Sequence, residues 1–347
     1  MATLKPLASQ VMVVTGATSG IGLTTARMAA KRGARLVLAA RDRAALETLA
    51  AELGDSGAQA LAVPTDVGIR AEVHALGEAA LQRFGRVDTW VNNAGVSIYG
   101  RLEDVPQADQ EQLFRTNFWG VVHGSLVALQ LMKQHGGAII NLGSELSDRA
   151  VPLQGMYSAS KHAVKGFTDA LRMEIEKDGV PVSVTLIRPA GVDTLFTGHA
   201  RNYLEHEPEL PAPLYAPELV ADAILYSAQH ARRDVYVGGA SRLMSLEAAH
   251  MPRLLDKFMN LVMFRQQQSA RPAAANRSDA LYQPNGAALQ QRQGGRRSRV
   301  HESSPYTFLS MRGKPLGMAL LVGGALFAAW KLQGKGQENA RVRTLAR

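Results

Sequence analysis

The stretch VMVVTGATSGIG, residues Val11 to Gly22, joins a short apolar run to a glycine-rich turn. The run predicts a buried β-strand, and the residues after it repeat apolar side chains at helical spacing. Gly16, Gly20 and Gly22 permit a tight turn in which backbone N–H groups at the start of the helix can approach a pyrophosphate. Any strand-to-helix corner can use glycine, so the rest of the chain must supply the context.

The same alternation of apolar runs and helical patterns continues to about residue 245, which is typical of βαβ units around a parallel sheet. Helices are predicted between the strands, for example over 21–31, 44–53 and 71–84. We therefore expect residues 1–245 to form one α/β, doubly wound, Rossmann-type domain. Its seven parallel strands are expected at 11–16, 35–40, 59–66, 87–95, 137–144, 182–189 and 234–239.

Beyond residue 245 the chain divides into four segments. An amphipathic helix is predicted over 246–265, with its apolar side packed on the domain. Residues 266–312 have no sustained period and predict a disordered linker. Residues 313–332 include PLGMALLVGGALFAAW (Pro315–Trp330), an uncharged candidate for a short transmembrane helix, and residues 333–347 form a basic tail. A core helix is the alternative, although a segment beyond a polar linker has no obvious core to join.

Composition excludes several classes of site and partner. The 347 residues contain no Cys, so disulfides, zinc–thiolate sites and cysteine nucleophiles are absent, and the nine His show no metal-ligand spacing. Residues 1–250 hold 23 Lys and Arg against 26 Asp and Glu, whereas residues 251–347 hold 16 against 4. The positive charge therefore belongs to the tail, which favours an anionic membrane surface over nucleic acid as a partner. A solvated basic tail is the alternative.

Tyr157 and Lys161 lie four residues apart in GMYSASKHAV, and on a helix this spacing places them on one face. A nearby ammonium favours the phenolate, so Lys161 is expected to lower the pKa of Tyr157 and to make it an acid/base group. The pattern YxxxK arises by chance too often to carry a function alone.

Several motifs in order give the chain a family resemblance. TGATSGIG (Thr15–Gly22), NNAG (Asn92–Gly95), RPAGVDT (Arg188–Thr194), and YxxxK with Ser144 thirteen residues upstream resemble the compact oxidoreductase branch of the short-chain dehydrogenase/reductase family. The resemblance covers residues 10–240, with Ala190 at a position where the family usually has glycine. The epimerase branch of the family has a different glycine spacing.

The resemblance implies a carbonyl–alcohol oxidoreductase that uses a nicotinamide coenzyme. Tyr157 would exchange a proton with the substrate oxygen, Ser144 would hydrogen-bond that oxygen, and Lys161 would also hold the nicotinamide ribose. Asn117 would anchor a water that connects Lys161 to solvent. Asn92 could instead have a purely structural role, in which its side chain satisfies backbone groups at the end of a strand. The coenzyme would contact Gly16, Thr18, Ser19, Gly20, Ile21, Gly22, Arg41, Asp66, Val67, Asn93, Ala94, Gly95, Tyr157, Lys161, Pro189, Val192 and Thr194.

The end of the second predicted strand, LVLAARDR, indicates which coenzyme is used. The family's acidic position for NAD falls on Ala40, and Arg41 follows it, which favours NADP because an Arg can pair with the 2′-phosphate. Asp42 argues the other way but is expected to cap the next helix.

The substrate is expected to be a small carbonyl or alcohol held under a lid at 195–217, where Phe196, Tyr203, Leu204, Leu214 and Tyr215 indicate a lipophilic pocket. The family resemblance implies a homo-oligomer. We expect a membrane-associated protein with a cytoplasmic catalytic domain, or alternatively a cytoplasmic enzyme. A noncatalytic, membrane-tethered NADP-binding sensor or scaffold is the alternative function.

Overall fold

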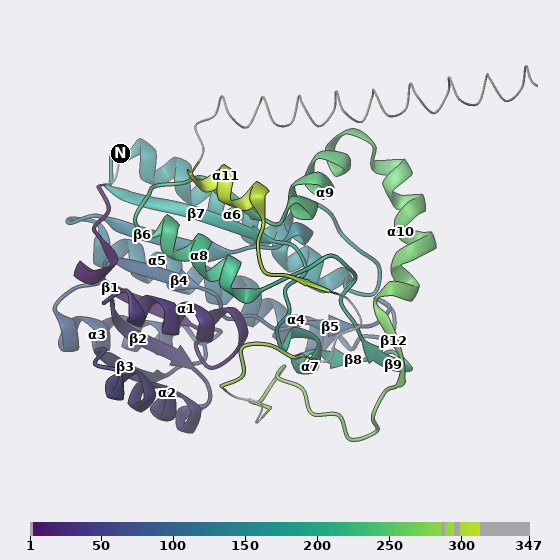
Figure 1. Ribbon diagram of the computed structural model, residues 1–347, viewed down its shortest axis with the longest axis horizontal. Helices are drawn as coiled ribbons and strands as arrows, with labels where there is room; N and C mark the ends of the chain where they lie inside the picture. Colours follow the sequence, from purple (N-terminus) through teal and green to yellow (C-terminus); the bar gives the residue numbers. More distant parts are fainter. Residues whose placement is uncertain (1–2, 286–288, 295–298, 313–347) are drawn as a thin grey trace, which may run out of the picture.

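A seven-stranded parallel sheet forms the centre of the computed structural model, which describes residues 3–285, 289–294 and 299–312 (Figure 1). The strand order is β11-β7-β6-β4-β1-β2-β3, and every pair in it is parallel. This confirms the predicted sheet and its seven strands. Their bounds are β1 Val11–Thr15, β2 Arg35–Ala40, β3 Ala60–Pro64, β4 Thr89–Asn92, β6 Gly137–Leu142, β7 Val182–Pro189 and β11 Asp234–Val237.

Helices cover both faces of the sheet (Figure 1). One layer contains α1 (Gly20–Lys31), α2 (Arg43–Asp55) and α8 (Pro217–Ser227), and the other contains α3 (Arg70–Phe84), α5 (Gly120–Met132) and α6 (Gly155–Lys177). Successive side chains of a strand point to opposite faces, so a strand covered on both sides must be apolar throughout. In β1, Met12 and Val14 pack against the first layer, while Val11 and Val13 pack against the second. The uninterrupted apolar run that opened the sequence is explained by this double burial.

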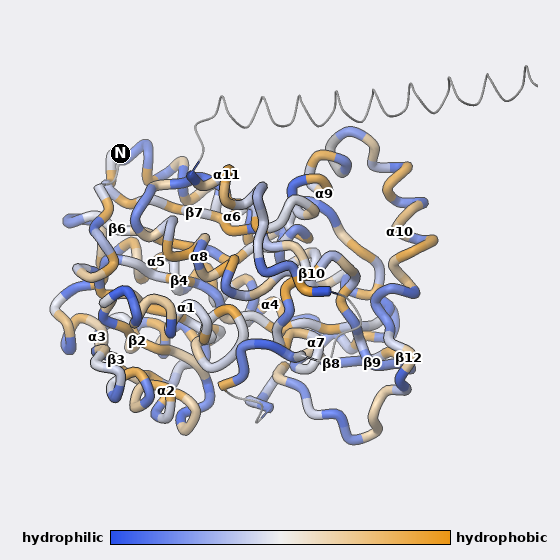
Figure 2. Tube along the Cα trace, viewed as in Figure 1, coloured by the Kyte–Doolittle hydropathy of each residue, from blue (hydrophilic) through white to orange (hydrophobic). Residues whose placement is uncertain are grey.

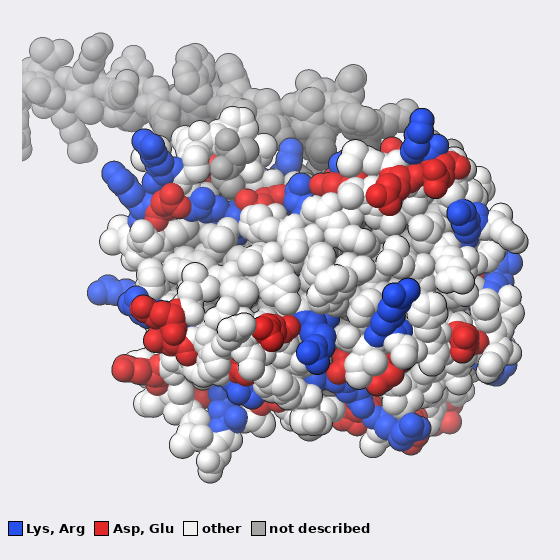
Figure 3. Space-filling model, turned by 180° about the vertical axis from the view of Figure 1, so that it is seen from behind, with Lys and Arg blue, Asp and Glu red and all other residues white. Residues whose placement is uncertain are grey.

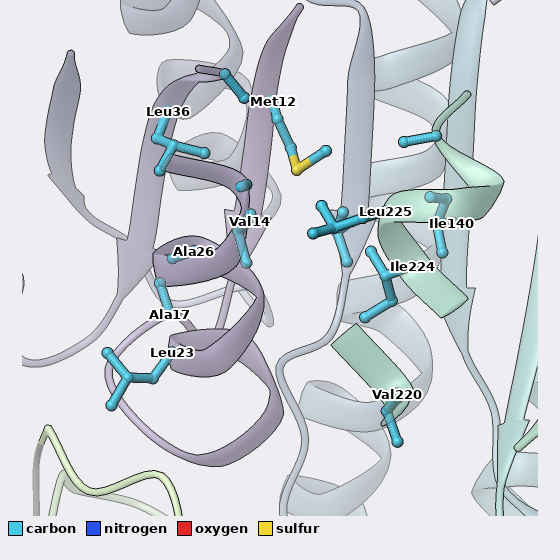
Figure 4. Close-up of a cluster of buried hydrophobic side chains, with 14 of the residues drawn as sticks. Met12, Val14, Ala17, Leu23, Ala26, Leu36, Ile140, Val220, Ile224 and Leu225 are labelled. Atoms are coloured by element: carbon cyan, nitrogen blue, oxygen red, sulfur yellow. The ribbon is translucent and has the colours of Figure 1, made fainter. Parts of the chain in front are cut away.

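The first core is drawn in Figure 4. Met12 and Val14 of β1 lie between Leu23 of α1 and Ile224 of α8, and all four side chains are fully buried. Removing about 25 cal/mol per Å² of apolar surface from water stabilises these contacts. The packing fixes α1 against the sheet and thereby positions the glycine-rich turn that precedes it.

The strand order reverses at β1 and β4, which creates a crevice at their carboxyl ends. The turn after β1 and the segment Asn93–Gly95 after β4 both open there. Asn93 joins them, because its side-chain amide donates to the carbonyl oxygens of Thr15 and Gly16 at 2.9 and 3.3 Å. Gly22 is required for the close approach, since a Cβ at this position would lie 2.1 Å from the Gly16 carbonyl oxygen.

The other elements are one short helical turn before β1 and the connecting and C-terminal elements that follow β4. They are η1 Leu7–Ser9, β5 Ile98–Tyr99, α4 Gln107–Phe114, the π-helical turn η2 Arg115–Trp119, η3 Glu145–Ser147, α7 Phe196–His199, β8 Arg201–Asn202, β9 His206–Pro208, β10 Leu214–Tyr215, α9 Gly239–His250, α10 Pro252–Gln266, β12 Gln268–Pro272, β13 Val300–His301 and α11 Pro305–Arg312.

The predicted amphipathic helix corresponds to α10, but part of its apolar side is exposed instead of packed on the domain. Leu255, Met259 and Met263 are buried, whereas Leu254 and Phe258 are 65% and 51% exposed. Figure 2 shows hydrophobic residues along this helix. Positions 255, 259 and 263 lie at i, i+4 and i+8, so the helix touches the domain along one narrow line. The apolar stripe in the sequence is wider than this contact.

The linker prediction for residues 266–312 was wrong for the part that the structure describes. After α10 the chain forms β12, which pairs with β9, and later β13 and α11, which pack on β10 and α8. The composition of the segment did not indicate this ordered structure, because backbone hydrogen bonds and a few widely spaced side chains hold the segment in place.

Residues 313–347, with the candidate transmembrane segment and the basic tail, lie outside the described residues. Among the helices that the structure does describe, none is long and apolar enough to cross a membrane.

Charges on the surface are mixed. On the face shown in Figure 3, basic and acidic side chains are interspersed instead of gathering into one basic patch. A nucleic-acid-binding domain concentrates basic charge on one face. The view therefore agrees with the charge balance of residues 1–250.

Candidate active site

Tyr157, Ser144 and Lys161 converge at the carboxyl end of the sheet. Tyr157 and Lys161 lie in the first two turns of α6, and Ser144 follows β6 as the N-cap of η3. Ser144 interacts with the Tyr157 phenol and lowers its pKa, and Lys161 Nζ lies 5.6 Å from the centre of the Tyr157 ring. All three side chains line one cavity, which we call the Tyr157 cavity. The structure thus brings together three of the four residues expected to be catalytic.

Burial controls the ionisation of this group. It raises the pKa of Tyr157 well above its ordinary value, an effect that the hydrogen bond from Ser144 opposes and the charge of Glu145 reinforces. The expectation that Lys161 lowers the pKa of Tyr157 is therefore not met. Lys161 is itself desolvated, with its pKa lowered to about 8, and its Nζ donates to the Leu142 carbonyl oxygen at 2.8 Å. The phenol of Tyr157 is held in its protonated form.

Asn117 lies deeper than expected. Its side chain is fully buried in the π-helical turn, accepts from the Val96 amide at 2.8 Å, and donates to the Val96 carbonyl and the Ser160 hydroxyl. Asn117 therefore holds the backbone that follows Gly95 in place. Its role in a water relay to Lys161 stays a prediction.

A second cavity lies beside the first, and we call it the Arg41 cavity. Both cavities include Gly95 in their walls, so they are neighbours, and we call the two together the cleft. The predicted coenzyme residues divide between them. The Arg41 cavity is lined by Gly16, Ser19, Arg41, Asp66, Val67, Ala94 and Gly95, and the Tyr157 cavity by Ile21, Asn93, Gly95, Tyr157, Lys161, Pro189, Val192 and Thr194.

The remaining predicted coenzyme residues, Thr18, Gly20 and Gly22, form the frame of the turn between the two ends. A side chain at Gly16 would put a Cβ 2.9 Å from Ala94 Cα, so only glycine keeps the turn this close to β4. The turn opens directly into α1, whose positive end favours an anion. The turn thus has the form that favours a pyrophosphate, and in this structure the Gly20 amide donates to the Gln290 carbonyl oxygen at 3.0 Å.

At the far end, Ala40 and Arg41 close the second strand as the sequence indicated. Asp42 caps α2 by accepting from the Ala45 amide at 3.0 Å, which confirms its predicted structural role. Asp66 accepts from the Gly68 amide at 2.9 Å. Burial lowers the pKa of Arg41, while the charges of Asp66 and Asp279 oppose this effect. Arg41 lines this cavity, together with His199.

The predicted NNAG motif contains two different roles. Asn92 is buried, and its side chain hydrogen-bonds Trp90, Ser125 and Asn141. Its role is therefore structural. Asn93 instead ties the glycine-rich turn to β4 and lines the Tyr157 cavity.

The lid contributes less to the cavity than its sequence suggested. Phe196 lines it, with its ring 5.2 Å from that of Tyr157. Tyr203 bonds Asp109, and Leu214 and Tyr215 are buried against the domain. The rest of the lid wall is formed by residues 210–213. Of the five lid residues expected to form a lipophilic pocket, Phe196 lines the Tyr157 cavity, whereas Tyr203, Leu204, Leu214 and Tyr215 are not among its lining residues.

Sequence reasoning missed several residues of the Tyr157 cavity. Met244 of α9 and Met263 of α10 supply an apolar wall, and Gln267 lies beside them. Glu145, next to Ser144, also lines the cavity, and burial raises the pKa of its carboxyl to about 7. The helical stripe of α10 was a signal for Met263, whereas nothing in the local pattern marked Glu145.

Comparison with known proteins identifies the family. The model of the short chain dehydrogenase family matches residues 10–204. The chain belongs to the short-chain dehydrogenase/reductase family. It is an oxidoreductase of that family.

Among its relatives, the uncharacterized oxidoreductase YxnA of Bacillus subtilis is 42% identical over 94% of this chain and 91% of its own length. This similarity extends beyond the sheet into the C-terminal part. The putative oxidoreductase SadH of Mycobacterium tuberculosis is 33% identical over 70% of this chain and 91% of its own. An alcohol dehydrogenase from Thermococcus sibiricus, solved in complex with 5-hydroxy-NADP, is similar with a TM-score of 0.58 and 28% identity, covering 66% of this chain and 95% of its own.

Proposed function

We propose that this protein interconverts a carbonyl compound and a secondary alcohol with NADP(H), and that Tyr157 is its general acid and base. The observation that carries the proposal is the convergence of Tyr157, Ser144 and Lys161 in a cavity that shares Gly95 with the Arg41 cavity. Tyr157, Ser144 and Lys161 would lie beside the nicotinamide end of the coenzyme, where hydride is transferred. Arg41 would lie beside the end that carries the 2′-phosphate.

The chain's own residues would handle the proton while the bound coenzyme supplies or accepts the hydride. Negative charge develops on the substrate oxygen during reduction, and Tyr157, kept protonated by burial, donates to it. Ser144 would hydrogen-bond the same oxygen. Lys161, adjacent to the phenol and charged below its pKa of about 8, would stabilise the phenolate that forms when Tyr157 gives up its proton.

NADP is favoured over NAD by the groups at the Arg41 end. Position 40 carries no carboxylate to repel a phosphate, and Asp42 is engaged as a helix cap. Arg41 can offer a charge-assisted pair to a 2′-phosphate, which NAD lacks. The similar alcohol dehydrogenase was solved with a coenzyme of the NADP type. Arg41→Ala should therefore weaken NADPH binding about tenfold or more and NADH binding much less.

The substrate is proposed to be lipophilic. Phe196, Met244 and Met263 line the Tyr157 cavity together with prolines of the lid. Methionine side chains adapt to irregular apolar ligands, so this wall suits a hydrocarbon skeleton beside the reacting oxygen. The proposed C-terminal membrane anchor would place the enzyme where such substrates collect.

The test is turnover of a panel of ketones, aldehydes and quinones with NADPH, by wild type and by Tyr157→Phe. The variant should lose at least about 100-fold in kcat, because a general acid contributes that much or more, and should keep its NADPH affinity. Tyr226→Phe on α8, outside both cavities, is the matched control and should retain activity. A Tyr157→Phe enzyme with more than about a tenth of wild-type kcat would rule out the proposed acid.

NADPH binding without turnover of any compound would instead favour the noncatalytic sensor.

A further inference from the structure

The chain after α10 returns to the cleft. In Figure 1 it runs from the lower end of α10 toward α1 and α2. We call its described residues 279–285 and 289–293 the C-terminal strap. These residues belong to the segment that composition assigned to a linker.

Side chains at the start of the strap anchor it to the domain. Asp279 pairs with Arg201 at 2.7 Å, and the Tyr282 hydroxyl donates to Asp109 at 2.8 Å. Leu281 between them is fully buried and packs with the cluster that contains Val96 and Leu113. A fully buried leucine is an unusual feature for a solvated linker. The contacts fix the position of the strap backbone at this point.

That backbone then holds Arg41. Its Nη1 donates to the carbonyl oxygens of Leu281 and Tyr282 at 3.2 and 3.0 Å, and its Nη2 donates to that of Ala280. A guanidinium has five N–H donors in a planar fork. The strap therefore uses both N–H groups of Nη1 and one of Nη2, and among the described residues no acceptor bonds Nε. The donors that remain for an anion are Nε–H and the second N–H of Nη2.

Further along, the strap follows the cleft. The Leu289 amide donates to the Thr18 carbonyl at 2.7 Å, and the Gln290 carbonyl accepts from the Gly20 amide at 3.0 Å. The Gln293 side chain accepts from the Thr197 hydroxyl at 2.8 Å. These contacts lead from the glycine-rich turn to the lid.

The strap encloses the Arg41 cavity and does not fill it. Ala280, Pro284 and Asn285 of the strap line this cavity together with Asp66 and Val67 of the sheet domain. The cavity therefore has one wall from the sheet domain and one from the strap.

We propose that the C-terminal strap is the outer wall of the coenzyme site and that it positions Arg41 to bind the 2′-phosphate of NADP. The inference rests on the proposed function and adds to it a second, distant segment of the chain as a determinant of coenzyme choice. Leu281 and Tyr282 are positioning residues that act through Arg41. Because NAD has no 2′-phosphate, loosening the strap affects NADPH more than NADH.

The experiment compares full-length wild type with Leu281→Ala, measuring dissociation constants for NADPH and NADH by calorimetry. Leu281→Ala should weaken NADPH binding about tenfold, as expected when one charge-assisted hydrogen bond is lost, and NADH binding less than threefold. Leu261→Ala, a matched change at a side chain 78% exposed on α10, should bind both coenzymes like wild type. Tyr282→Phe removes only one hydroxyl and should show a smaller shift in the same direction if Leu281→Ala does not fold.

Two further readouts separate positioning from general damage. In an Arg41→Ala background, Leu281→Ala should add less than about twofold, because both changes remove the same contact. NADPH should also slow amide hydrogen exchange in residues 279–285 of the wild type. Unchanged or tighter NADPH binding by Leu281→Ala, additive losses with Arg41→Ala, or exchange that NADPH does not alter would each overturn the proposal. A wild type that binds no NADPH would refute the proposed function as well.

Discussion

Because of Lys161, the free energy of unfolding of this protein should increase between about pH 7 and pH 9.5. The substitution Lys161→Met should remove this increase. Its Nζ is buried, with its pKa lowered from 10.5 to about 8 by desolvation. Between those two values the unfolded chain holds a proton on this amine that the folded protein has released. The unfolded state binds more protons, so the free energy of unfolding increases with pH across this interval and its full cost is present below pH 8.

The size of the effect follows from the pKa. Each pH unit between the folded and unfolded values changes the free energy by about 1.4 kcal/mol. From pH 7 to pH 9.5 the unfavourable contribution of Lys161 should fall by about 2 kcal/mol. Lys161→Met has no amine to titrate. The difference in unfolding free energy, wild type minus variant, should therefore rise by about 2 kcal/mol over the same range.

Urea unfolding at pH 7.0 and 9.5 measures this difference. Comparing the two pH values cancels effects that do not depend on pH, such as the loss of the bond to the Leu142 carbonyl. Lys165→Met is the control, because Lys165 lies on the same helix, is 35% exposed and pairs with Asp169 at the surface. For Lys165→Met, the unfolding free energy of wild type minus that of the variant should change by less than about 0.5 kcal/mol between the two pH values. If the same quantity for Lys161→Met also stays constant between pH 7.0 and 9.5, the argument that desolvation lowers the pKa of Lys161 is refuted.

Three other predictions test the site and the chain end. Glu145→Gln should remove an inflection near pH 7 from the profile of kcat/KM, because the carboxyl has a pKa of about 7 and its charge raises the pKa of Tyr157; identical profiles would exclude this coupling. Gly22→Ala should lower the unfolding free energy by about 1–3 kcal/mol, since its Cβ would overlap the Gly16 carbonyl. Gly166→Ala, where an added Cβ meets open space in α6, should be neutral or stabilising; thermal melts of both variants measure the difference. Full-length protein should sediment with membranes and resist carbonate extraction, while a chain ending at Arg312 stays in the supernatant; full-length protein that is soluble without detergent would reject the anchor.

Much of the site was predictable because its parts are local. The strand–turn–helix at 11–22 and the pair Tyr157 and Lys161 each depend on residues within a few positions of one another. Their meeting point was also predictable, since parallel strands bring their carboxyl ends to one edge of the sheet. Asp42 as a helix cap is another local feature, and the structure confirms it.

The sequence by itself thus determined the sheet, the turn and the Tyr157–Lys161 pair, because hydrophobic periodicity and glycine placement act over short distances along the chain. The tertiary structure decided the direction of the Tyr157 pKa, the entry of Glu145 and Met263 into the cavity, and the path of the strap. Each of these depends on burial or on contacts between distant residues. Arg41 and the Leu281 carbonyl are separated by 240 positions. No local pattern records such a contact, because it forms only when the folded domain supplies the surface on which the strap lies.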